Sequence, residues 1–197
     1  MKLMQEAGHP ASCQGVDLMK HFELETERLL LRHFRHGDGD AVAALLTDAE
    51  VCRFEPFEVM SREDAFSEAE RYAATKGIYA VILKETGQLI GKLTLTDQQF
   101  FGAYELGYTL RRDCWGNGYT VEAARAVMEY GFTVKGVRRI TAETDVQNVR
   151  SRRVLEKLGM RQEGIFVKSA AYQTSETGEP VWSDYCAYAI LREEFLK

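Results

Sequence analysis

A short glycine-bearing segment, Trp115–Thr120, is the first place in this sequence whose residue types suit a chemical task. It reads Trp-Gly-Asn-Gly-Tyr-Thr, follows a β-type run over 104–110 and precedes a helical pattern. The first turn of a helix has unpaired N–H groups and the positive end of the helix dipole, and glycines let a phosphate approach the backbone. We therefore predict an anion site here. A simple tight turn is the alternative, because Gly116 and Gly118 alone would also make one.

The spacing of these glycines differs from that of two common phosphate-binding motifs. A Walker loop needs Gly-Lys-Ser/Thr after its glycines, and a dinucleotide fold needs G-x-G-x-x-G; this segment has neither. The net charge of the chain is −5, yet residues 111–157 contain ten Lys and Arg against six Asp and Glu. The local positive excess favours a bound anion, and the overall charge argues against nucleic acid as a partner.

A helix predicted over 148–158 is the second segment with chemical potential. Asn148, Ser151 and Leu155 lie at positions i, i+3 and i+7, so they share one face of that helix. The same helix carries three candidate phosphate contacts: Arg150, Arg152 and Arg153. Runs of charge on a helix face are usually only solvated, so the arginines alone do not settle the matter.

The elements that must position these two segments alternate between β and α patterns. Strands are expected at 27–32, 79–84, 89–95, 104–110, 139–144, 161–168 and 182–191. Helices are expected at 41–46, at 61–75 with Ser61 as N-cap, between the glycines and Gly136, and at 148–158. A Thr-, Ser- and Glu-rich stretch over 173–180 is expected to be an exposed loop.

Length and composition indicate one globular domain. The chain has 197 residues, of which 45% are apolar and 28% charged, so one substantial core is expected over residues 23–197, with 1–22 as an N-terminal extension. Its apolar runs are far shorter than the about 20 residues that a membrane-spanning helix needs. The N-terminus has no continuous apolar stretch of the kind a secretory signal requires, so we expect a cytoplasmic protein that does not bind membranes.

The cysteines and histidines give no sign of a metal site. The four cysteines are far apart and form no C-x-x-C pair, so they are expected to be reduced thiols. The four histidines fall within the first 36 residues, away from the two segments above. We therefore predict no bound metal.

Taken together, the motifs resemble the GNAT superfamily of acyl-CoA-dependent N-acetyltransferases, specifically its RimJ/RimL-like branch of ribosomal-protein N-terminal acetyltransferases. The resemblance covers residues 24–193 and depends on six motifs in the right order and spacing. These are Thr26–Arg32, Leu89–Gly91, Glu105–Tyr108, Gly116–Tyr119 with Glu122–Ala123, the helix that begins at Asn148, and Glu163–Gly164.

The resemblance implies a fold and a cofactor. The fold would be α/β, with a mixed, mainly antiparallel sheet of about seven strands, flanked by helices and splayed between the 104–110 and 139–144 strands. The cofactor would be acetyl-CoA, with its pyrophosphate on residues 115–120, its pantetheine and thioester along the strand end at Leu110, and a phosphate near Arg153. The implied cofactor-binding residues are Leu110, Trp115, Gly116, Asn117, Gly118, Tyr119, Thr120, Asn148 and Arg153.

The resemblance also implies catalytic roles, with two departures from the family pattern. Leu155 stands where many members have the tyrosine that protonates the departing thiolate, and Ala170 stands where RimL-like members have a glutamate. Ser151 is the implied proton donor, with capping of the helix start as its alternative role. Glu105 is the implied base, acting through a water, with a purely structural carboxylate as its alternative.

The implied reaction is direct transfer of an acetyl group to a primary amine in a ternary complex. The acceptor would be a protein N-terminal α-amine or a small amine such as an antibiotic, a polyamine or an amino acid. Acceptor choice is expected to depend on residues 50–75 and on the 173–180 loop. A non-catalytic acyl-CoA-binding module is the alternative, because of Leu155 and Ala170, and a homodimer is possible.

Overall fold

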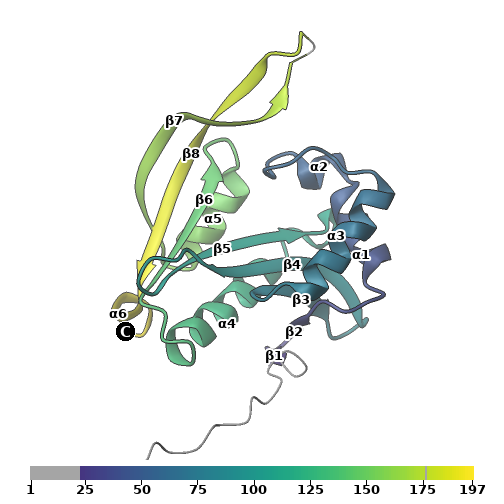
Figure 1. Cartoon of the computed structure of the whole chain (residues 1–197). Coiled ribbons are helices and arrows are strands. Elements are labelled where there is room, and N and C mark those ends of the chain that lie inside the picture. The colour runs from purple at the N-terminus through teal and green to yellow at the C-terminus, as the bar shows by residue number, and fades with distance from the viewer. Residues whose placement is uncertain (1–22, 176) are drawn as a thin grey trace, which may run out of the picture.

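The computed structural model of the chain describes residues 23–175 and 177–197, so the predicted extension over 1–22 lies outside the described part. One eight-stranded sheet has the order β1-β2-β3-β4-β5-β6-β8-β7 (Figure 1). The strands are β1 (Glu23–Glu25), β2 (Leu29–His33), β3 (Ile78–Leu83), β4 (Gln88–Asp97), β5 (Ala103–Leu110), β6 (Arg139–Asp145), β7 (Arg161–Thr174) and β8 (Pro180–Leu191). The helices are α1 (Gly39–Leu46), α2 (Ala49–Cys52), α3 (Arg62–Ala74), α4 (Tyr119–Thr133), α5 (Val149–Lys157) and α6 (Arg192–Phe195), and a 3-10 turn, η1, spans Arg112–Cys114.

The sheet confirms the predicted α/β class and corrects the strand number from about seven to eight. The additional strand, β1, has the sequence Glu-Leu-Glu and pairs antiparallel with β2. Three residues are too few to show the alternation that marks a strand in sequence. β7 also continues beyond the predicted end at Lys168 to Thr174, with shifts of register against β8, and β8 begins at Pro180, so both ends of the predicted 173–180 loop are strand.

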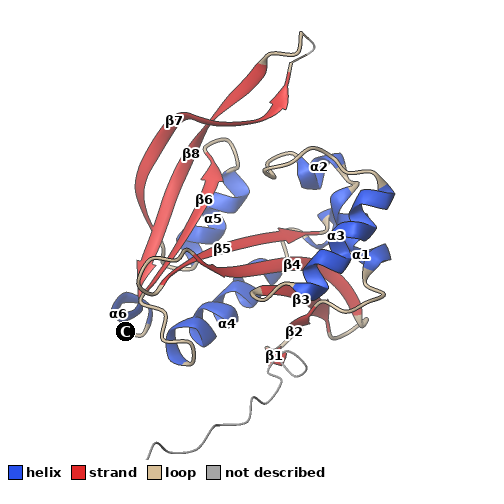
Figure 2. Ribbon diagram, viewed as in Figure 1, coloured by secondary structure: helices blue, strands red, loops and turns tan. Residues whose placement is uncertain are grey.

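The sheet splits between β5 and β6. These two strands run parallel and pair only over Ala103–Glu105 with Arg139–Thr141. Beyond that point they diverge, as Figure 2 shows, and the remainder of β6 pairs with β8 instead. The predicted splay between these strands is therefore present, and it opens a gap in the sheet toward the carboxyl ends of β5 and β6.

Two apolar cores fix the position of this gap. The larger core lies between the sheet and helices α4 and α5, and includes Met128, Phe132 and Leu155. The smaller core joins α1 and α3 to β3, with Leu46 and Tyr72 among its buried side chains. Along β3 the buried side chains alternate between the two cores, with Tyr79 and Val81 in the larger core and Ile78, Ala80 and Ile82 in the smaller one.

The middle of the sheet differs from this pattern on the face opposite α4. There the side chains that alternate with core residues on β4, β5 and β6 are polar or glycine: Lys92, Thr94, Thr96, Glu105, Gly107, Thr109, Thr141 and Glu143. A polar face is costly to bury without partners, so this part of the sheet is suited to face a ligand or solvent.

The described residues contain no helix that is both long and apolar enough to cross a membrane. Within the same ranges, no group of three or more His, Cys, Asp or Glu side chains is arranged to hold a metal ion, and Cys52, Cys114 and Cys186 are free thiols.

Candidate active site

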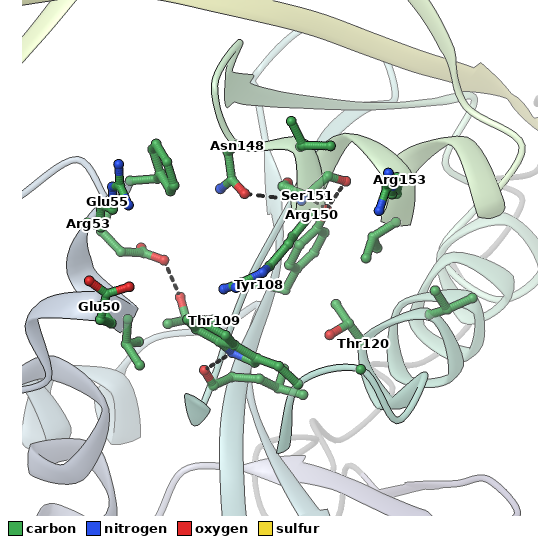
Figure 3. Close-up of a pocket in the computed structure, with 18 of the residues that line it drawn as sticks. Glu50, Arg53, Glu55, Tyr108, Thr109, Thr120, Asn148, Arg150, Ser151 and Arg153 are labelled. Carbon is green, nitrogen blue, oxygen red and sulfur yellow. Dashed lines mark hydrogen bonds between the residues drawn. The ribbon is translucent and has the colours of Figure 1, made fainter. Parts of the chain in front are cut away.

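A cavity of about 730 Å³ occupies the gap in the sheet (Figure 3). Four segments line it: α2 with the residues that follow it, the end of β5, the turn over 115–121, and α5 with the residues just before it. The two segments singled out from the sequence therefore meet across one space. They lie close together because α4 and α5 pack on the same core, although more than thirty positions separate Gly116 from Arg150.

The glycine turn leaves bare backbone at one wall of the cavity. Gly116 and Gly118 have φ angles of 81° and 80°, a left-handed conformation that side chains disfavour. A Cβ at Gly116 would meet no atom within 4 Å, and one at Gly118 would meet only the Arg28 guanidinium at 3.6 Å. Gly118 is also the N-cap of the 15-residue helix α4, where no side chain caps the first turn. Open space over unpaired N–H groups fits a phosphate.

The N-terminal strands hold this turn in place. Glu122, in the first turn of α4, accepts hydrogen bonds from Thr26 Oγ1 at 2.6 Å, the Arg28 backbone N–H at 2.8 Å and Arg28 Nε at 2.7 Å. Arg28 Nη1 also donates to the Asn117 carbonyl at 3.0 Å, and the guanidinium lies 4.6 Å from the centre of the Tyr119 ring. The Thr26–Arg32 motif thus acts by positioning the turn.

Three cations line the cavity along α5: Arg150, Arg153 and Lys157. The Arg150 guanidinium stacks 4.6 Å from the centre of the Trp115 ring. Arg152, the other candidate from the sequence, turns away and makes long hydrogen bonds to Tyr188 Oη and the Val146 carbonyl, both at 3.4 Å. The local positive charge expected from the sequence is therefore concentrated beside the glycine turn.

The end of β5 is fixed by the tryptophan of the turn. Trp115 Nε1 donates to the Leu110 carbonyl at 2.8 Å. The next residue, Arg111, donates its N–H to Ile90 on β4 at 2.9 Å. Because N–H groups alternate in direction along a strand, the N–H of Leu110 points the other way, into the gap.

Ser151 faces the cavity and pairs with a tyrosine that sequence reasoning had quoted without giving it a role. Ser151 Oγ and Tyr108 Oη are 2.9 Å apart, and burial raises the pKa of the Tyr108 phenol. The N-cap of α5 is Asn148, whose Oδ1 accepts from the Ser151 N–H at 3.1 Å. The helix cap is thus Asn148, which leaves the Ser151 hydroxyl to Tyr108.

Several sequence-derived candidates lie outside the cavity. Asn117 and Tyr119 belong to the turn but do not line it. Leu155 is buried in the larger core, and Ala170 is on β7 opposite Ser183. Glu105 stands where β5 and β6 diverge, and the five residues from it to Leu110 span about 17 Å of extended strand.

Glu55 is a carboxylate at the cavity wall that no sequence motif marks. The segment 50–75 was expected to influence acceptor choice, but no residue within it was assigned a role. Its Oε1 accepts a hydrogen bond from Thr109 Oγ1 at 2.8 Å, across 54 positions of sequence. Burial raises the pKa of Glu55, against the opposing effects of the Lys92 charge and the Thr109 hydrogen bond.

Comparison with known proteins identifies the class to which this fold and site belong. The acetyltransferase (GNAT) domain model matches residues 28–161, and the chain belongs to that family. It is therefore an acyltransferase, with the N-acetyltransferase activity that defines the family. The chain is 35% identical over 175 residues to a Bacillus subtilis protein named as the uncharacterized N-acetyltransferase YnaD, a match that covers 87% of this chain and 98% of the relative.

Solved structures agree with this assignment. A GNAT-family acetyltransferase from Bacillus anthracis superposes with a TM-score of 0.79 and 34% identity, covering 88% of this chain and all of that chain. RimJ from Mycobacterium smegmatis, solved in complex with CoA-disulfide, has a TM-score of 0.68 and 22% identity, and covers 86% of this chain and 84% of that chain. At that identity the second likeness establishes the fold alone.

Proposed function

We propose that this enzyme transfers an acetyl group from acetyl-CoA directly to a primary amine, with both substrates in the cavity at once. The observation that carries the proposal is the polarity of the cavity. One wall offers bare N–H groups and the cations Arg150, Arg153 and Lys157, which suit phosphates, and the opposite wall offers carboxylates, which suit an amine. Bound acetyl-CoA would supply the acetyl group as a thioester.

The turn over 115–120 would hold the pyrophosphate through its backbone. Gly116 and Gly118 leave the necessary space, and the first turn of α4 directs its N–H groups there. Asn148 would contact the pantetheine chain with the amide nitrogen that its capping role leaves available. The Leu110 N–H would donate to the thioester carbonyl and stabilise negative charge on that oxygen as the amine attacks.

Ser151 would deliver a proton to the departing sulfur. Its hydroxyl is at the cavity wall and within hydrogen-bond distance of Tyr108, so the phenol can replace the proton that the serine gives up. None of the three described cysteines lines the cavity, which favours direct transfer over an acyl-cysteine intermediate. Glu105, the base expected from the sequence, would have to act through water at its distance from Leu110.

The acceptor would be a protein N-terminal α-amine or a small primary amine. The RimJ/RimL-like motifs of the sequence support the first possibility. An α-amine has an unperturbed pKa of about 7.7 to 8.0, against about 10.4 for lysine, so it loses its proton more readily near neutral pH.

Release of free thiol from acetyl-CoA tests the proposal. The panel would contain a peptide with a free N-terminus, the same peptide already acetylated, spermidine and a free amino acid, with mass spectrometry of each product. We expect thiol release with at least one free amine and none with the blocked peptide. Tight CoA binding in calorimetry without acetylation of any amine would instead identify a non-catalytic acyl-CoA-binding module.

A further inference from the structure

One side of the cavity carries carboxylate side chains, which are candidates for the catalytic base. Glu50 and Glu55 line the side formed by α2 and the residues after it, across from Thr120 and Arg153, as Figure 3 shows. Arg53 is on this side too, but its guanidinium lies over the Phe54 ring at 5.1 Å, and its carbonyl accepts from Gln173 on β7.

We propose that Glu55 is the general base of this enzyme: it receives the acceptor as an ammonium ion and takes the proton from its nitrogen. The inference deepens the proposed acetyl transfer and rests on it. It also defines the acceptor as a primary amine that enters the cavity in its charged form.

Geometry carries the proposal. Thr109, which holds Glu55 Oε1, immediately precedes Leu110, whose N–H points to the place expected for the thioester carbonyl. Among residues 23–175 and 177–197, Glu55 Oε2 has no hydrogen-bond partner. One carboxylate oxygen is therefore fixed next to the reaction site, and the other is available to an incoming N–H.

The surroundings of Glu55 suit a base. Four elements place titratable groups near it: Lys92 on β4, Cys52 on α2, Tyr72 on α3 and Tyr185 on β8. Lys92 is itself half-buried, donates to Tyr72 Oη at 3.3 Å, and has a pKa lowered by desolvation. Burial also raises the pKa of Glu55, which moves its proton affinity toward that of an amine.

Glu105 is less well placed for the same task. It belongs to the polar face of the sheet, which Glu55 contacts through Thr109, but it does not line the cavity. Its negative charge raises the pKa of Glu143, after the larger effect of burial, so these two carboxylates lie near one another.

The protons balance as follows. The ammonium nitrogen gives one proton to Glu55, and its freed electron pair forms the bond to the acetyl carbon. The carbon–sulfur bond breaks and its electron pair leaves with the sulfur, which takes a proton from Ser151. The nitrogen then loses a second proton, which passes through Tyr108 or a water and restores the Ser151 hydroxyl. Glu55 releases its proton to solvent.

The test compares Glu55→Gln with the parent enzyme over pH 6 to 9, using the best amine of the panel. With a peptide α-amine we expect kcat/KM to fall roughly 10²-fold or more at pH 6.5, because a positioned base contributes at least that much. The deficit should narrow as pH rises toward the pKa of the amine, since free amine then forms without help. CoA affinity by calorimetry should match the parent. The matched control is Glu58→Gln, which removes an exposed carboxylate three positions away and outside the cavity.

Two variants move the pKa of Glu55 without removing the group. In the parent, the Lys92 charge and the Thr109 hydrogen bond both lower the pKa of Glu55. Lys92→Met removes the charge and Thr109→Val removes the hydrogen bond, so each variant raises that pKa. Each variant should therefore shift the acidic limb of the kcat/KM profile to higher pH. These two variants keep the proposal testable if Glu55→Gln fails to fold. Glu55→Asp serves the same purpose, because it keeps a carboxylate and should retain the acidic limb of the kcat/KM profile.

The outcomes distinguish failure of the Glu55 assignment from failure of the proposed acetyl transfer. An unaltered profile in Glu55→Gln, or a rate loss that is the same at every pH, would overturn the role of Glu55. Loss of the acidic limb in Glu105→Gln with retention in Glu55→Gln would restore the base to Glu105. A parent enzyme that binds CoA but acetylates no amine would overturn the proposed function itself, and the base with it.

Discussion

Charge at position 118 offers the sharpest test of the anion site. Gly118 has a left-handed φ angle, so any side chain there adds backbone strain of about 1 to 2 kcal/mol. Asn and Asp tolerate this conformation about equally and have nearly the same size. The pair Gly118→Asn and Gly118→Asp therefore differs mainly by one negative charge at the opening of the turn.

The magnitude follows from that charge. A carboxylate about 4 Å from a phosphate costs about 1 kcal/mol in water and about 4 kcal/mol at the effective dielectric of a protein surface. The aspartate variant should thus bind CoA between about 5-fold and about 1,000-fold more weakly than the asparagine variant. Space alone would not produce this difference, because a Cβ at Gly118 meets only Arg28 Nη2 at 3.6 Å.

Calorimetric titration of CoA into both variants measures the difference directly. Thermal unfolding should show the two variants melting together, a few degrees below the parent. Equal CoA affinity of the folded asparagine and aspartate variants would refute the placement of a phosphate at this turn. A loss of affinity that high salt largely restores would support it, because screening weakens exposed charge repulsion.

Three further predictions concern the proposed proton donor, the side chain that ties the glycine turn to the N-terminal strands, and an ion pair of the fold. Ser151→Ala should lower kcat roughly 10²-fold and leave CoA affinity nearly unchanged, because the proton is needed only as the sulfur departs; calorimetry and steady-state rates separate the two. Glu122→Gln should weaken CoA binding and lower the melting temperature by about 2–4 °C through loss of the tie to Arg28, whereas unaltered binding would show that the turn stands unaided. Asp38 has a pKa held below its usual range, because hydrogen bonds from Arg32 and Arg35 outweigh the opposing effect of burial. Its contribution to the free energy of unfolding is therefore present above about pH 4 and lost as pH falls through the lowered pKa, so Asp38→Asn should cost stability at pH 7 and progressively less below pH 4 in chemical denaturation.

The periodic elements of the fold could be predicted because their signals are local. Ser61 caps α3 as expected, with its hydroxyl oxygen accepting from the Asp64 N–H at 3.1 Å. The two short helices α2 and α6, of four residues each, were missed, because one turn is too short to show a helical period. The divergence of β5 from β6 came from family resemblance, since no property of either strand's own sequence marks it.

The site residues also differ in whether the signal that marks them is local in the sequence. The glycine turn, Asn148 and Ser151 could be recognised because each belongs to a short motif whose spacing is visible in the chain. Glu55 could not, because its importance depends on Thr109, which is distant in sequence and becomes its neighbour only when α2 packs beside β5. Glu105 is the converse case: its motif is conspicuous in the chain, but it stands near the start of β5, five residues before the strand end that lines the cavity.

The contacts of Trp115 give the enzyme a built-in optical reporter. The chain has two tryptophans, and Trp182 is exposed near the end of the β7–β8 hairpin, away from the cavity. Trp115 instead lies at the cavity wall, with its indole N–H on the Leu110 carbonyl and the Arg150 guanidinium over its ring. A ligand that draws Arg150 toward its phosphate removes a cation from the indole face, so emission from Trp115 changes when the site fills. A Trp182→Phe background would leave that emission as a single-residue signal, suited to following the arrival of CoA in real time.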